Sequence, residues 1–182
     1  MAPFTSGLTT LPPSMSTVAP FGATSLYDAI ARTAERIAPR EGRRRAIVVF
    51  TDGRDNGSRM APSEVSGLAS AIDVPVYLFA AVPAIDNPTT EFSTAEGDST
   101  LAGSLSDFAT WTGGHVFVAS TTAARKMAAR QIVDELRQQY LLSFESSGLP
   151  GWHSLEVRAR NRSLTVRARS GYIAGQSRPS SD

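Results

Sequence analysis

Two apolar runs without a polar interruption constrain the fold of this chain more than any other feature. They are IVVF at 47–50 and VPVYLFAAV at 74–82, and the helix-like stretch APSEVSGLASAID lies between them at 61–73. A strand buried on both faces of a sheet reads as a continuous apolar run, whereas a strand with one wet face alternates. Strand, helix, strand in this order predicts a right-handed parallel crossover.

The flanking sequence continues the alternation of helix and strand. Apolar residues recur at spacings of three and four within 24–40, which predicts an amphipathic helix capped by Thr24 or Ser25. We also expect a short helix, a third buried strand and a long helix, at 102–114, 115–119 and 121–139. In the long helix, the residues expected to face inward are Met127, Ile132, Val133 and Leu136. The predicted fold class is α/β, a three-layer α/β/α Rossmann-like architecture with a mostly parallel sheet.

After residue 139 the pattern changes to period two. We expect strands within 140–146, 152–160 and 163–173, with a hairpin-like break at Asn161 and Arg162. Two of these strands alternate apolar and charged residues, and their outward arginines are Arg158, Arg160, Arg167 and Arg169. Such a strip is either a solvated sheet face or a contact for an anionic partner.

The chain therefore divides into four expected parts. They are a weakly ordered segment at 1–21, an α/β domain at 22–139, an antiparallel β extension at 140–174 and a disordered tail at 175–182. Within the α/β domain, residues 83–100 are polar and aperiodic, and we expect an extended loop there.

Composition excludes several classes of function. The 182 residues carry 18 basic and 17 acidic side chains, so the formal net charge of +1 gives no general electrostatic case for nucleic acid or an anionic membrane. The absence of cysteine excludes disulfides, thiolate metal sites and cysteine nucleophiles. The first 22 residues lack a basic start followed by an apolar run, so we expect no secretory signal in them, and we expect no membrane span. The cellular compartment remains open.

The residue that raises the question of function is Asp52, where the first apolar run ends in TDG. Open parallel sheets bind ligands beyond the carboxyl ends of their strands. A hard cation such as Mg²⁺ takes oxygen ligands there, and the hydroxyl of Thr24 is the obvious second donor. The alternatives are that Asp52 simply forms a turn and that Thr24 simply caps the helix. Asp55 is expected to shape the loop, and Asp28 to favour the helix dipole.

Several segments resemble von Willebrand factor A-type domains, in particular a bacterial branch with an added antiparallel end. The resemblance runs from about Gly22 to Ala174. It is carried by GATSLYDAI, IVVFTDGRDN, SAIDVPVYLF, TGGHVFVA, IVDELRQQYLLSF and VRARSGYIA.

This resemblance implies a non-enzymatic adhesion or assembly module. In such domains a divalent cation sits at a metal-ion-dependent adhesion site, and a carboxylate from the partner protein completes its coordination. The family's threonine falls on Thr24 and its second aspartate on Asp52, whereas nothing before Gly22 reads as a strand ending in the family's Asp-x-Ser-x-Ser run. The implied site is therefore incomplete, with Mg²⁺ held weakly or not at all. A sheet edge open to a protein partner or to self-association is also implied, as in a fragment or a degenerate domain.

Two other functions remain open. One is a Mg²⁺-dependent phosphoryl hydrolase with Asp52 as nucleophile, although Arg54 stands where such enzymes usually place a second carboxylate. The other is a structural fragment that binds an acidic partner through its arginine strip.

Overall fold

The computed structural model describes most of the chain, namely residues 22–40, 45–52, 54–71, 73–81, 93–94, 103–145 and 149–174. Its helices are α1 (Leu26–Ile37), α2 (Pro62–Ala71), α3 (Gly103–Thr112) and α4 (Thr122–Arg137). Its strands are β1 (Ile47–Thr51), β2 (Val76–Ala81), β3 (Ser93–Thr94), β4 (Val116–Ala119), β5 (Gly151–Ser154) and β6 (Gly171–Ala174). No helix in these ranges has the length and apolar character needed to cross a bilayer.

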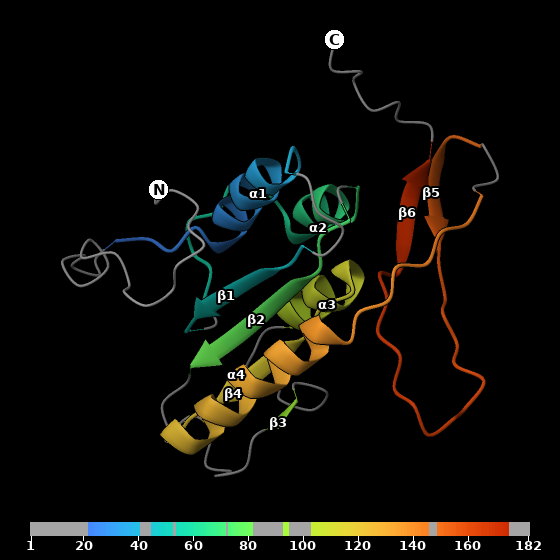
Figure 1. Ribbon diagram of the computed structural model, residues 1–182. Coiled ribbons are helices and arrows are strands. Elements are labelled where there is room, and N and C mark those ends of the chain that lie inside the picture. Colours follow the sequence, from blue (N-terminus) through green and yellow to red (C-terminus); the bar gives the residue numbers. More distant parts are fainter. Residues whose placement is uncertain are drawn as a thin grey trace.

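The main sheet has the strand order β1-β2-β4-β3 (Figure 1). β1 pairs with β2 in parallel and β2 pairs with β4 in parallel, while β3 is antiparallel to β4. The continuous apolar runs of the sequence are these parallel strands, and every residue of β4 is buried. The expected parallel pairing of the two runs, with a helix between them, is confirmed.

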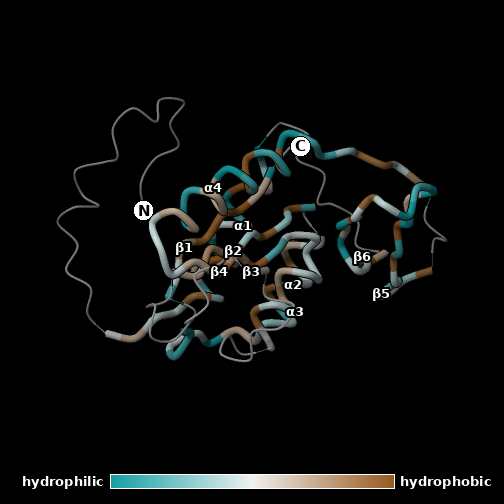
Figure 2. Tube along the Cα trace, turned by 90° about the horizontal axis from the view of Figure 1, so that it is seen from below, coloured by the Kyte–Doolittle hydropathy of each residue, from teal (hydrophilic) through white to brown (hydrophobic). Residues whose placement is uncertain are grey.

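Helices cover both faces of this sheet, which confirms the three-layer α/β/α fold class. α1, α2 and α3 share one buried cluster with the odd face of β1, where Ile47 lies, and with Val76, Leu78 and Ala80 of β2. Among the described helices, the one that packs against the opposite face, which includes Phe79 of β2, is α4. The hydrophobic strands lie between α4 on one side and α2 and α3 on the other (Figure 2).

Among the described residues β1 is an edge strand, and part of its backbone has no partner there. The Ile47 N–H donates to the carbonyl oxygen of Pro75 on the β2 side at 3.0 Å. Successive residues of a strand point their N–H groups to opposite edges, so the N–H groups of Val48 and Phe50 face away from β2. Among the described residues no strand lies on that side of β1. The Phe50 ring contacts Phe79 on the α4 face, yet it is 74% exposed because α4 packs over β2 and β4.

The inward face of α4 agrees with the prediction at Ile132 and Leu136 but not at Met127 and Val133. Ala124, Ala128 and Ile132 are its buried residues, at a spacing of four, whereas Met127 is 58% exposed and Val133 is 45% exposed. The small alanines let the helix approach the aromatic rings of β2 and β4 closely, so the longer side chains turn outward. Leu136 packs against this cluster as expected.

The C-terminal part forms an arm, residues 149–174, beside the helical layers (Figure 1). Its ladder is short, since β5 and β6 pair only from Gly151 with Ala174 to Ser154 with Gly171. Residues 141–145 and 155–170 belong to no strand, so the strand predicted within 140–146 is not found in its described part, and the two longer strands are found only at their ends. The arm lies against the body where the Ser170 N–H donates to Trp111 O at 3.2 Å, at the end of α3.

Two of the expected solvated arginines are instead anchors of this arm. Arg167 forms an ion pair with Glu135 of α4. Arg169 donates to Ser70 O, at the end of α2, at 2.8 Å and lies 3.5 Å from Asp73 Oδ1. Three helix ends collect at this side of the sheet, and unpaired carbonyl groups there favour cations. The predictions for 1–21 and 175–182, and most of those for 83–100, fall outside the described residues.

Candidate functional site

The loop that follows β1 folds back onto the start of α1. The N–H groups of Asn56 and Gly57 both donate to Thr24 O, each at 3.0 Å. In return the Thr24 N–H donates to Asn56 Oδ1 at 2.6 Å, and Ser25 Oγ donates to Gly57 O at 2.9 Å. A Cβ at Gly57 would lie 3.0 Å from Ser25 Oγ, so this approach suits a residue without a side chain. We call residues 24–28 and 55–60 together the clasp.

Asp55 supplies the N-terminal cap that α1 does not make for itself. Ser25 occupies the N-cap position but makes no side-chain cap hydrogen bond. Instead, Asp55 Oδ2 accepts from the Tyr27 N–H at 3.1 Å and from Ser58 Oγ, and Asp55 Oδ1 accepts from the Ser58 N–H at 3.1 Å. Burial of this carboxyl raises its pKa, but the hydrogen bonds from Ser58 and from the first turn of α1 outweigh burial, so the pKa of Asp55 lies below its ordinary value.

Asp28 fastens the clasp from the helix side. Its Oδ1 accepts from the N–H groups of Arg59 and Met60 at 3.1 and 3.0 Å, and its own N–H donates to Ser58 Oγ at 3.2 Å. The expected dipole role at the first turn of α1 is compatible with this arrangement, because Asp28 lies in that turn. Asp28 and Asp55 therefore both serve as acceptors for the backbone of the clasp.

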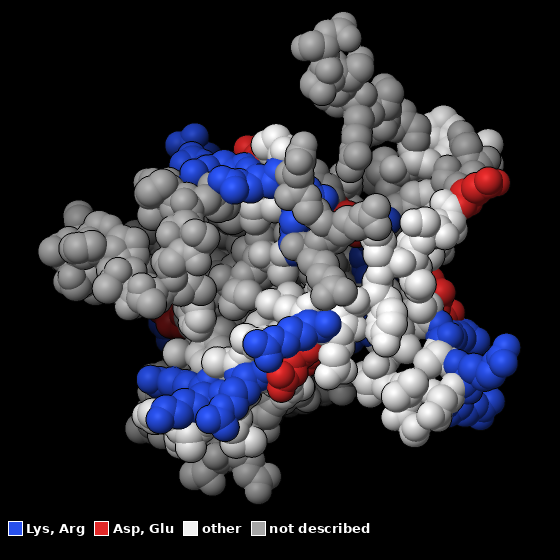
Figure 3. Space-filling view, viewed as in Figure 1, with Lys and Arg blue, Asp and Glu red and all other residues white. Residues whose placement is uncertain are grey.

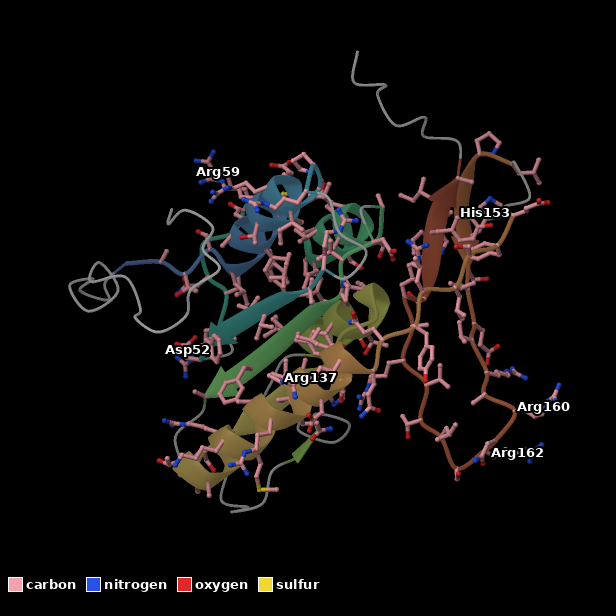
Figure 4. The ribbon with its side chains drawn as sticks, viewed as in Figure 1. Asp52, Arg59, Arg137, His153, Arg160 and Arg162 are labelled. Carbon is pink, nitrogen blue, oxygen red and sulfur yellow. The ribbon has the colours of Figure 1, made fainter. Side chains whose placement is uncertain are left out.

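Asp52 lies outside the clasp, at the carboxyl end of β1 (Figure 4). Its side chain is exposed and Oδ1 accepts from the Arg54 N–H at 3.2 Å, which is a local turn contact. Thr24 is also exposed, and the clasp holds its backbone through Asn56 and Gly57. The structure thus brings the two predicted residues to the same end of the sheet.

The residues at this end do not fit a tightly held cation. Of the residues predicted here, the Thr24 hydroxyl and the Asp52 carboxylate have oxygen atoms that could bind a cation. The carboxylates of Asp28 and Asp55 instead accept hydrogen bonds within the clasp. Within the described ranges no three side chains of His, Cys, Asp or Glu are grouped so that they could hold a metal ion. Two protein donors leave most of an octahedral shell to water.

The residues that sequence reasoning missed are Asn56 and Ser58, together with the structural roles of Asp28 and Asp55. The stretch DNGS at 55–58 is a recognisable turn signal. The segment it contacts, however, begins about thirty residues earlier, and only the tertiary fold brings the two together. Periodicity and turn chemistry are local signals and do not report such a contact.

This chain resembles a known protein in structure but matches none in sequence. No model of a protein family matches this chain, and a search of curated proteins found no match. Among solved structures, the chain is similar to the conserved hypothetical protein BatB from Bacteroides thetaiotaomicron. The identity is 18%, the TM-score is 0.43, and the match covers 71% of this chain and 66% of that one. A likeness of this size carries no information about what either protein binds.

Proposed function

We propose that this chain is a non-enzymatic protein-binding module of the von Willebrand factor A type, which engages partners at the edge strand β1 and the adjoining carboxyl end of the sheet. The single observation that carries this proposal is the open edge of β1. Within the part of the chain that the structure describes, the outward N–H groups of this apolar strand have no partner and lie next to an exposed aromatic ring, and such an edge pairs readily with another strand.

The clasp supports the same proposal, because it fixes the shape of the neighbouring surface. Asp28 and Asp55 tie the loop after β1 to α1 through hydrogen bonds at both ends. A surface that is already ordered loses less conformational entropy when it binds. Thr24 and Asp52 then contribute exposed oxygen donors beside the edge strand.

A divalent cation has a secondary place in this proposal. Mg²⁺ at Thr24 and Asp52 would bind weakly, since the chain offers two donors, and partner binding would depend mainly on the β1 edge. An enzymatic role for Asp52 would require a neighbouring acid or base. The residue two positions after Asp52 is Arg54, which is not an acid, and its backbone N–H donates to Asp52 Oδ1.

Sedimentation velocity on the whole chain tests the proposal. We expect concentration-dependent self-association, which Phe50→Glu reduces at least tenfold in association constant, because a charge replaces the exposed ring at the edge. Met127→Glu is the matched control, since Met127 is an exposed apolar residue of α4 on the outer surface. Asp52→Asn, and EDTA in place of Mg²⁺, should change the association less than threefold.

Three results would contradict the proposal. A wild-type chain that stays monomeric at high concentration would remove the open edge as a binding surface. Equal effects of the Phe50 and Met127 variants on the association constant would indicate nonspecific hydrophobic association. Hydrolysis of p-nitrophenyl phosphate that requires Mg²⁺ and is lost in Asp52→Asn would favour the hydrolase.

A further inference from the structure

The arm carries a second surface, at the end of the sheet opposite Asp52 (Figures 1 and 4). Its outgoing leg is residues 155–160, LEVRAR, and its return leg is residues 164–169, LTVRAR. The return leg is held on the body, as Arg167 pairs with Glu135 and Arg169 donates to Ser70 O. In the outgoing leg the exposure alternates from Leu155 to Arg160, with the apolar residues partly buried and the charged ones exposed.

Within the described chain, the backbone of the outgoing leg is almost entirely unpaired. One backbone hydrogen bond joins it to the rest of the described chain, from the Leu155 N–H to Ser170 O at 2.8 Å. The Leu155 N–H therefore faces the return side, and the alternation of an extended chain turns the N–H groups of Glu156, Arg158 and Arg160 to the outer side. This outer side offers a row of donors and acceptors on a leg whose exposure alternates with the period of a strand.

The arginines along the arm are not all engaged. Arg158 forms an ion pair with Glu156, which is exposed on the same leg. Arg160 and Arg162 have no ion pair within the described part of the chain, and both lie at the far end of the arm (Figure 4). Basic side chains gather there on the surface (Figure 3).

We infer that the outgoing leg binds an extended acidic segment of another protein, which adds as a strand along the outer edge of residues 155–160. The partner's main chain would pair with the N–H and carbonyl groups of Glu156, Arg158 and Arg160. Acidic side chains at every second position of the partner would meet the arginines, because residues two apart on a strand lie on the same face. Main-chain pairing would supply affinity, and charge would supply selectivity.

Charge and composition decide against two other occupants. The outgoing leg carries two arginines and one glutamate, so in a pair of identical legs at least one arginine of each copy would lack an acidic partner, whereas an acidic segment would supply one for each. Single-stranded nucleic acid is bound through aromatic side chains that stack on bases, and residues 155–169 contain no aromatic residue. This inference goes beyond the proposed function, since it concerns a surface that β1 and Asp52 do not share.

The test uses the whole chain and a fluorescent peptide of alternating glutamate and valine, followed by fluorescence anisotropy at low salt. We expect saturable binding that weakens in high salt. Arg160→Ala with Arg162→Ala should lower the affinity roughly three- to tenfold, as expected for two exposed charge pairs. Arg125→Ala with Arg130→Ala, on the exposed surface of α4, is the matched control and should leave the affinity unchanged.

A second pair of variants separates backbone pairing from charge at one position. Glu156→Ala removes a negative charge that would repel the acidic peptide, and it frees Arg158 from its ion pair. This variant should therefore bind the peptide as tightly as the wild type or more tightly. Glu156→Pro makes the same charge change but also removes the outward N–H, and its affinity should fall at least threefold below that of Glu156→Ala. Residue 156 lies on an exposed leg outside the ladder of β5 and β6, so neither change should alter the fold.

The outcomes that overturn the inference are distinct from those that overturn the β1 proposal. Equal binding by Glu156→Ala and Glu156→Pro, or by a peptide N-methylated at alternate residues, would show that no strand is added. Tighter binding of oligothymidylate than of the acidic peptide would assign the arm to nucleic acid. Absence of peptide binding at low salt would remove the surface altogether, and none of these results depends on Phe50.

Discussion

Asp52 and Asp55 are three positions apart, yet they occupy different environments. Asp55 is partly buried and accepts hydrogen bonds from Ser58 and from the start of α1, whereas Asp52 is exposed and accepts from the backbone of its own turn. A carboxylate that caps a helix contributes to stability, and one that is left exposed is available to a ligand. The side chains are chemically identical, so the difference comes entirely from where the loop folds.

This difference predicts a pH-dependent stability. The pKa of Asp55 is lower in the folded chain than its ordinary value of about 3.9 in an unfolded chain. The unfolded state therefore takes up the proton first as the pH falls, so the stabilisation is complete above about pH 4 and is lost as the pH falls through the folded pKa. Urea unfolding of Asp55→Asn should show a loss of roughly 1 to 2 kcal/mol at neutral pH that shrinks in acid.

The matched control for this measurement is Asp52→Asn, because Asp52 is exposed and makes one local contact. Its free energy of unfolding should change by less than about 0.5 kcal/mol at either pH. Equal losses in the two variants would mean that the clasp does not stabilise α1.

Elements of secondary structure were predictable to the extent that local pattern dictates them. The runs at 47–50 and 74–82 became β1 and β2, and the apolar stripe at 24–40 became α1. The errors lie where tertiary contacts decide. Met127 was expected inside α4, but the approach of the helix to the sheet selects alanines, and Arg167 was expected in solvent but pairs with Glu135.

The candidate site was predictable in the same limited sense. Thr24 and Asp52 could be placed at one end of the sheet, since Thr24 opens a helix, Asp52 ends a strand, and helix N-termini meet the carboxyl ends of parallel strands there. The clasp could not be predicted, because it depends on contacts between segments far apart in the sequence, such as Asn56 with Thr24. The exposure of Phe50 could not be predicted either, because it arises where α4 does not extend over β1.

The docking of the arm on α3 gives a prediction at the scale of elements. Gly113 follows the last residue of α3 with a φ of +83°, and a Cβ there would lie 2.7 Å from the backbone nitrogen of Arg169. Gly113→Ala should therefore destabilise the chain by more than about 1 kcal/mol and displace the return leg, measured by urea unfolding with tryptophan fluorescence. Gly67→Ala within α2 is the matched control, because a Cβ there meets nothing within 4 Å, and it should be neutral or stabilising. Equal behaviour of the two variants would contradict the docking of the arm described above.

The α/β body carries a different surface at each end of its sheet. The carboxyl end of the sheet carries the clasp, Asp52 and the open edge of β1, and the opposite end carries the arm on the ends of three helices. Under both proposals, this layout would let the chain hold two different proteins at once. The proposed function depends on β1 acting as a binding edge.

Hydrogen exchange of the β1 amides, measured by NMR on dilute and concentrated chain, tests this claim most directly. The N–H groups of Val48 and Phe50 face the open side, whereas the Ile47 N–H is bonded to Pro75 O. We expect Val48 and Phe50 to exchange quickly in dilute solution and to become protected at least tenfold as the chain associates, while Ile47 is protected at every concentration. Equal and strong protection of all three amides in the dilute monomer would overturn the proposed function, because the edge of β1 would then be closed within one chain.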